Sequence, residues 1–119
     1  MFFAYVLILS SCSQHTYKGI EVTLKNSSSS TIHDIEIGTS EKLSTINDVT
    51  LNPGKEKSSF LSMKENKTDG SYSIQFTLPD GRKENIAAGY YTNGAPMEKT
   101  MYIDIQSDTT LVTFGSISY

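Results

Sequence analysis

Residues 72–78 read YSIQFTL, and a turn sequence, PDG, follows at 79–81. Apolar side chains alternate with polar ones here, which is the pattern of a strand that buries one of its two faces. A second segment with strand character runs from Lys83 to about Tyr91. Two such segments joined by a short turn rich in Pro, Asp and Gly predict a β-hairpin.

The same alternation recurs on both sides of this hairpin. From Gly19 onward no window has the i, i+3, i+4, i+7 spacing of an amphipathic helix. The segments 20–24 and 33–37 flank a serine-rich turn, so we expect them to pair as another hairpin. Residues 19–119 are therefore predicted to form one all-β domain, a β-sandwich. Its other strands are expected near Val49, Ser58, Met101 and Thr110.

Two turn motifs lie in the segment from Val49 to Leu78, namely LNPG at 51–54 and DGSY at 69–72. The segment resembles the immunoglobulin-like and CARDB-like accessory domains of bacterial envelope proteins. In those domains Leu-x-Pro-Gly precedes one strand and Asp/Gly-x-Tyr opens the next. The resemblance implies an immunoglobulin-like β-sandwich of about seven to eight short antiparallel strands. Turn motifs support a fold and transfer no active site.

The amino terminus has the pattern of a targeting signal. Its apolar run, 2–9, has eight residues and is too short to span a bilayer, which takes about 20. The run ends in LSSC at 9–12, which resembles the bacterial lipobox. The resemblance implies that 1–11 are a signal peptide, that Cys12 becomes the lipidated first residue, and that 12–18 form a tether. The alternative is that Cys12 is an ordinary small buried side chain.

The expected cellular location follows from the same resemblance. Cys12 is the only cysteine, so it cannot form an intramolecular disulfide. The lipobox implies a bacterial, Bacteroidetes-type lipoprotein that is held in the cell envelope by its lipid anchor. No acidic cluster follows Cys12, which favours the periplasmic side of the outer membrane over the cell surface.

Charge and side-chain chemistry exclude several classes of function. The net charge of −3 is spread along the chain without a basic block, which argues against nucleic acid as a partner. The sequence has two histidines, His15 and His33, and no metal-ligand spacing, nucleophile motif or phosphate loop. His33 shares the alternation phase of Ile35 and Ile37, so we expect it to be half-buried rather than a catalytic base. We predict no enzyme activity and no cofactor.

A calcium loop is the one metal site to weigh. The segment Glu65–Gly70 contains oxygen ligands and a glycine, but Lys67 lies in its middle and the EF-hand spacing is absent. The sequence therefore favours a plain loop at this position.

The strongest signal for binding is the tyrosine-rich stretch 89–94. Neighbouring residues of a strand face opposite ways, so one of Tyr90 and Tyr91 is expected in the core and the other at the surface beside Asn93. An exposed ring next to polar groups can stack on a sugar or grip a peptide, and Tyr102 could extend the same patch. The alternative is a tyrosine that only covers the sandwich edge. The alternation does not settle which ring points outward.

A modification site is suggested by Asp108-Thr109-Thr110, which resembles the O-glycosylation acceptor of secreted Bacteroidetes proteins. The resemblance implies a glycan on Thr109. A simple turn explains the same residues.

Taken together, these observations predict a small envelope lipoprotein whose β-sandwich binds a protein or a glycan without catalysis. One alternative is an inhibitor or immunity-type protein, which would use a protruding turn such as Asn93–Met97. Another is a glycan hydrolase, which needs two carboxyl groups about 5–9.5 Å apart in a cleft.

Overall fold

The structure is a computed structural model that describes residues 18–117. Within this range the chain forms nine strands and no helix, and so no described segment is a helix able to cross a membrane. The predictions for the signal peptide 1–11, for Cys12 and for residues 12–17 of the tether fall outside the described residues.

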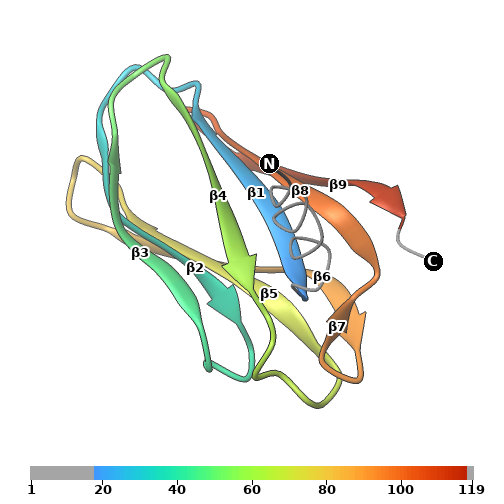
Figure 1. Cartoon of the computed structure of the whole chain (residues 1–119). Helices are drawn as coiled ribbons and strands as arrows, with labels where there is room; N and C mark the ends of the chain where they lie inside the picture. Colours follow the sequence, from blue (N-terminus) through green and yellow to red (C-terminus); the bar gives the residue numbers. More distant parts are fainter. Residues whose placement is uncertain (1–17, 118–119) are drawn as a thin grey trace, which may run out of the picture.

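The strands form two sheets that face each other, as a sandwich does (Figure 1). The four-stranded sheet has the order β4 (Glu56–Ser62), β1 (Gly19–Asn26), β8 (Glu98–Ile105) and β9 (Thr110–Ile117). The five-stranded sheet has the order β3 (Thr45–Leu51), β2 (Ile32–Thr39), β5 (Gly70–Thr77), β6 (Lys83–Thr92) and β7 (Ala95–Pro96). The all-β prediction is confirmed.

The core lies between the sheets and is built from the alternating apolar positions. In β5 the buried residues are Tyr72, Ile74 and Phe76, as the alternation predicted. The hairpin of β5 and β6 is confirmed as well, because Ile74 lies opposite Ile86 in an antiparallel register. Its turn is closed by the amide of Gly81, which donates to the carbonyl oxygen of Leu78 over 2.9 Å.

The pairing of the first two long strands differs from the prediction. β1 and β2 do not form a hairpin, since β1 pairs with β4 and β8, and β2 pairs with β3 and β5. The serine-rich segment between them crosses from one sheet to the other. Asn26 holds this crossing, because its buried side-chain amide donates to the carbonyl oxygens of Ser30 and Leu51, each over 2.8 Å.

The sheets are not purely antiparallel, contrary to the prediction. β1 and β8 run parallel, with Val22 opposite Met101. The described residues form nine strands rather than the predicted seven to eight, and the additional one is the two-residue β7. Alternation along one strand carries no information about the direction of its neighbour, so the sequence could not reveal the parallel pair.

A bulge in β2 places His33 on the surface, so the prediction that it is half-buried is wrong. Asp34 has φ 51°. Around this residue the register of β2 shifts in its pairing with both neighbouring strands, β3 and β5. A bulge inserts one extra residue and reverses the phase of the strand. Ile32 and Ile35 therefore both face the core although they are three residues apart, while His33 is exposed.

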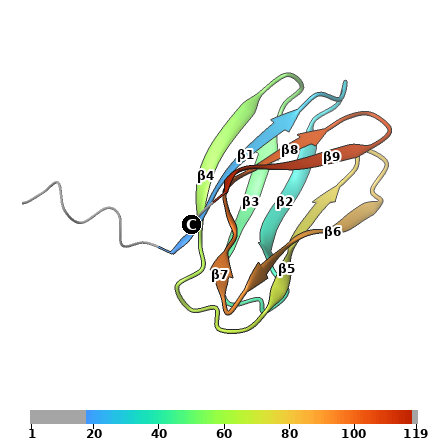
Figure 2. The ribbon, with the colours of Figure 1, turned by 90° about the vertical axis from the view of Figure 1, so that its right-hand side faces the viewer.

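The sandwich has two distinct ends (Figure 2). β1 begins at the end where β4 and β9 finish, which we call the tether end. The segments 40–44, 63–69 and 93–97 also lie there. The opposite, distal end carries the turns 27–31, 52–55, 78–82 and 106–109.

Candidate functional site

A cleft of about 370 Å³ opens at the distal end, between the β5–β6 turn and the β8–β9 turn. We call it the distal cleft. Its lining comprises Phe76, Leu78, Arg82, Glu84, Ile86, Gln106, Ser107, Asp108, Thr109 and Thr110. A smaller hollow of about 110 Å³ adjoins it, since both are lined by Leu78, Gln106 and Ser107, and that hollow reaches the serine-rich turn at 28–30.

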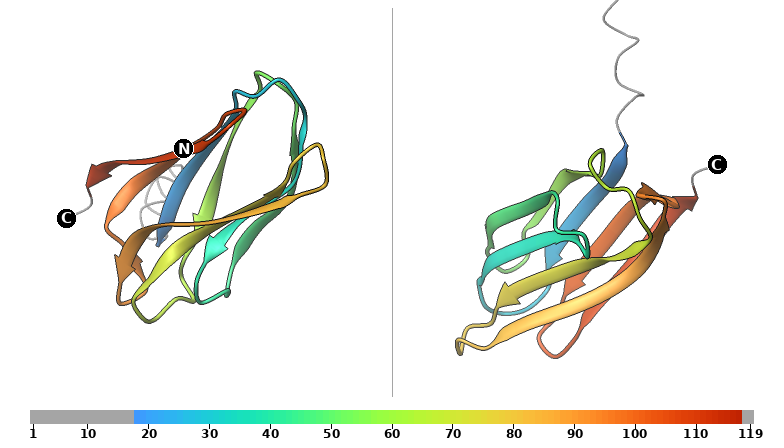
Figure 3. Two further views of the ribbon diagram at one scale, coloured as in Figure 1. Left: turned by 180° about the vertical axis from the view of Figure 1, so that it is seen from behind. Right: turned by 90° about the horizontal axis from the view of Figure 1, so that it is seen from below.

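The cleft lies on the side of the sandwich that β6 and β9 border, away from β3 and β4. β3 and β4 are joined by a tight turn and stand close together (Figure 1). On the other side the edges are β6 and β9, which Figure 3 shows from behind. The side chains at this opening are half-buried hydrophobic residues that pack against the core, namely Leu78, Ile86, Ala88, Val112 and Phe114.

Toward the tether end, the side chain of Phe114 fills the space between β6 and β9. The Phe114 ring packs on the buried Tyr72 ring, with centroids 5.7 Å apart. It also lies over Gly89, where a Cβ atom would collide with it. Glycine at position 89 thus allows β9 to approach β6, and the hollow space is restricted to the distal end.

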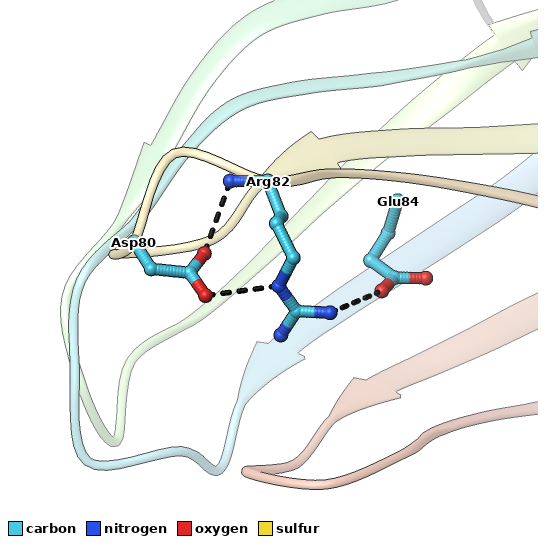
Figure 4. A network of polar contacts seen from close by, with 3 residues as sticks. All are labelled: Asp80, Arg82 and Glu84. Carbon is cyan, nitrogen blue, oxygen red and sulfur yellow. Dashed lines mark hydrogen bonds and ion pairs between the residues drawn. The ribbon is translucent and has the colours of Figure 1, made fainter.

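The rim of the cleft carries a network of charged side chains (Figure 4). Arg82 Nε donates to Asp80 Oδ2 over 2.9 Å, and Arg82 Nη1 lies 3.9 Å from Glu84 Oε2. The hydrogen bonds from the Arg82 backbone amide and then from its side chain hold the pKa of Asp80 below its ordinary value. These groups are largely exposed, so water screens their interactions.

The wall of the cleft opposite this network is formed by the end of β8 and the turn after it, and hydrogen bonds fix its side chains. Gln106 Nε2 donates to Asp104 Oδ2 over 3.1 Å, and Ser27 Oγ donates to the other oxygen of the same carboxylate. The bond from Ser27, followed by that from Gln106, lowers the pKa of Asp104. Thr109 is exposed in the β8–β9 turn, where its carbonyl oxygen accepts from the Gln106 amide over 2.8 Å.

The tyrosines predicted as a binding patch lie elsewhere, at the tether end. Tyr90 is 51% exposed, and its hydroxyl donates to Asp69 Oδ2 over 3.2 Å. The backbone amide of Asn93 donates to the other oxygen of Asp69 over 2.9 Å. The negative charge of Asp69 raises the pKa of Tyr90. The structure thus brings Tyr90 and Asn93 together around one carboxylate.

Tyr91 is fully buried and belongs to the core. Its ring packs on Tyr72 with centroids 5.5 Å apart, and its hydroxyl donates to Glu41 Oε2 over 2.8 Å. Burial is the main cause of its raised pKa. The other oxygen of Glu41 accepts from the amides of Lys67 and Thr68, and the Lys67 bond is the main reason for the lowered pKa of Glu41.

Tyr102 does not join Tyr90. It lies in β8 between the buried Met101 and Ile103, so its ring, 36% exposed, faces away from the core on the outer side of the four-stranded sheet. Tyr90 belongs to the edge of the five-stranded sheet. The expected extension of one patch over both rings is therefore wrong.

The turn after Asn93 is packed at Gly94, whereas Met97 beyond it is 42% exposed. Gly94 is buried, its amide donates to the Thr68 carbonyl oxygen over 2.7 Å, and a Cβ atom there would collide with the backbone of Asn66. Asn66 is itself buried and donates to Thr39 Oγ1 over 3.2 Å. Residues 65–70 thus form a loop that is anchored by the buried Asn66 and otherwise mostly exposed. No cluster of three or more His, Cys, Asp or Glu side chains suited to a metal occurs between residues 18 and 117.

Sequence reasoning missed the distal cleft as a site. Its walls come from the segments 76–86 and 106–110, which are distant in sequence. The only signals were the PDG turn and the Asp108-Thr109-Thr110 motif, and neither reveals that the two turns border one hollow.

Comparison with known proteins supports the fold and nothing finer. No protein-family model matches the sequence, and no curated protein matches it. A protein from Eubacterium rectale, whose structure was determined by NMR, has a similar structure with a TM-score of 0.56. The match covers 87% of this chain and 95% of that one at 12% sequence identity, so it shows a shared fold alone.

Proposed function

We propose that this protein is a non-catalytic binding module whose distal cleft receives part of a protein or glycan partner. The observation that carries the proposal is the cleft of about 370 Å³ between two turns. Binding sites are commonly concave clefts of about 300–1,000 Å³. The lining of this one is mostly polar, with Arg82, Glu84 and Gln106 among its polar groups, and Leu78 and Ile86 supply apolar surface.

We also propose that Cys12 carries a lipid anchor in the outer membrane, on its periplasmic side. An extended chain spans about 3.3–3.6 Å per residue, so the stretch from Cys12 to Gly19 reaches roughly 25 Å. β1 begins at the end of the sandwich opposite the β5–β6 and β8–β9 turns (Figure 2), and these two turns border the cleft. An anchored molecule would therefore hold the cleft away from the membrane, where a partner can reach it.

The immunoglobulin-like class is proposed for the sandwich on the strength of its two facing sheets and its alternating inward residues. The parallel pair of β1 and β8 is a departure from a purely antiparallel sandwich. An experimental structure with this strand order would support the assignment, and a different order would contradict it.

The hydrolase alternative is less well supported. Glu84 and Asp108 both line the cleft, as a pair of catalytic carboxyl groups would. A general acid, however, is prepared by shielding it from water. The Glu84 side chain is 42% exposed and lies beside Arg82, which suits a solvated binding rim.

Photo-cross-linking in intact cells tests the binding proposal. A photoreactive amino acid at Ser107, which is exposed and lines both hollows, should capture a partner. The control is the same replacement at Ser58, which is exposed on the outer side of β4. Capture from both positions alike, or from neither, would contradict a ligand in the distal cleft.

A further inference from the structure

Among residues 18–117, no strand pairs with most of the outer edge of β6. One edge of β6 pairs with β5, from Lys83 opposite Thr77 to Tyr91 opposite Gly70. Within the described part of the chain, the other edge pairs only with β7, through Tyr91 and Thr92. An edge strand turns the N–H and C=O groups of every second residue outward, where another strand can bind them.

The free part of this edge is regular. The register with β5 runs without a shift from Lys83 to Ala88, and the bulge at Gly89, with φ 70°, lies beyond it. Proteins commonly protect sheet edges with bulges, and β3 has such an irregularity at Asp48, with φ 58°. The segment Lys83–Ala88 has no bulge, and it borders the distal cleft.

The opening also exposes apolar surface to a strand lying along β6. Ile86 and Ala88 on β6, and Val112 on β9, are only half-buried. An inserted strand with apolar residues at every second position would cover them and complete the core on this side.

Charge indicates which strand would fit. The rim holds the carboxylates of Asp80, Glu84 and Asp108. The cations beside them are two, Arg82, which is bound to Asp80, and the exposed Lys83 at the start of β6. The local charge is therefore negative. A Lys or Arg side chain of the ligand would find complementary charge there.

We infer that the edge of β6 accepts an extended segment of a partner protein as an added strand, in line with β7. The segment would alternate apolar and polar residues and carry a basic residue at the rim. β7 already pairs with this edge for two residues before the chain crosses to β8. An added strand would therefore extend the backbone pairing that β7 makes with β6. The inference rests on the proposed binding function and selects a peptide over a glycan, because the one aromatic ring that lines the cleft, Phe76, is 3% exposed and offers no stacking face.

The test uses the isotopically labelled full chain in detergent micelles and the acetylated peptide KVTVTVTK. NMR amide shifts should change at residues 83–88 and 107–110, and every second amide in 83–88 should exchange with solvent at least about tenfold more slowly. The matched control is the same peptide with N-methyl groups on alternate amides, which keeps the side chains and removes the donors. It should not bind.

A charge reversal provides an independent readout. Glu84→Lys should weaken binding of the basic peptide about tenfold and strengthen that of EVTVTVTE. Glu21→Lys is the control, because Glu21 is exposed on β1 in the other sheet and outside the cleft. It should leave both affinities unchanged.

Several outcomes would overturn strand addition. They are equal binding of the N-methylated peptide, shifts confined to another face, no binding at millimolar peptide, or self-association through β6 in analytical ultracentrifugation. If Ser107 still captures a partner in cells, the binding proposal stands and only the added strand is wrong. If Ser107 captures nothing as well, both fail.

Discussion

Tyr90 and Tyr91 are neighbours in β6 with opposite surroundings. The Tyr91 ring is fully buried against Tyr72, whereas Tyr90 is half exposed and reaches Asp69. The bulge at Gly89 sets this arrangement, because it shifts the register after Ala88 and turns the second tyrosine inward. The alternation before the bulge would have turned Tyr90 inward, and no pattern in the sequence marks the shift except the glycine itself.

Alanine at these two positions should therefore have unequal effects on stability. Tyr91→Ala removes a buried ring and should lower the free energy of unfolding by about 3–5 kcal/mol. Tyr90→Ala should leave it nearly unchanged, because surface substitutions seldom affect stability. Urea denaturation followed by far-UV circular dichroism measures both. Tyr90→Ala should also leave capture at Ser107 intact. A loss of capture would indicate that the partner binds at Tyr90 rather than in the distal cleft.

At the scale of the strand, alternation located the elements well but not their partners. The segment 72–78 predicted both β5 and its hairpin, because the turn between β5 and β6 is short and its chemistry is visible. The segments 20–24 and 33–37 showed equally clear alternation, yet β1 and β2 lie in different sheets. A polar linker of this kind is compatible with a hairpin and with a crossing, and the buried side chain of Asn26 selects the crossing.

The effect of the bulge in β2 on stability can be tested by substituting Asp34. Asp34 has φ 51°, a conformation that β-branched residues adopt at a cost of about 1–2 kcal/mol. Asp34→Val should lower the free energy of unfolding by roughly this amount, and Asp34→Gly should preserve it. Glu36→Val, on the same strand at a residue without a positive φ, is the control for the change in side-chain character. An equal loss in Asp34→Val and Glu36→Val would mean that the bulge conformation is not the cause.

At the scale of the whole molecule, the two ends of the sandwich differ in how completely they are packed. The tether end is filled by loops that bind one another through Glu41, Asp69 and Gly94. The distal end contains the cleft. The sequence pointed to the tether end because tyrosines are conspicuous there, and the candidate site could not be predicted because it arises from the distance between two sheets. Spacing along a chain does not encode that distance.

The proposed lipid anchor can be tested at Cys12. Cys12→Ala should release the protein from the membrane fraction and abolish incorporation of labelled fatty acid, because the thiol is the attachment point in the lipobox interpretation. The circular dichroism spectrum should stay that of a β protein. Fatty acid labelling that persists in this variant would contradict the lipoprotein interpretation, and Ser13→Ala serves as the neighbouring control.

A glycan on Thr109 would lie at the distal end, where we propose that the partner binds. Thr109 is exposed in the β8–β9 turn and lines the distal cleft, so a glycan on its hydroxyl would occupy space at the mouth. If the native protein carries this glycan, Thr109→Ala should lower its mass by the mass of the sugar and raise the yield of capture at Ser107, because the cleft becomes accessible. Thr50→Ala, at an exposed threonine of β3 outside the cleft, should change neither. Intact-mass spectrometry of protein from the native host measures the first effect, and a mass equal to that of the unmodified chain would exclude the glycan at Thr109.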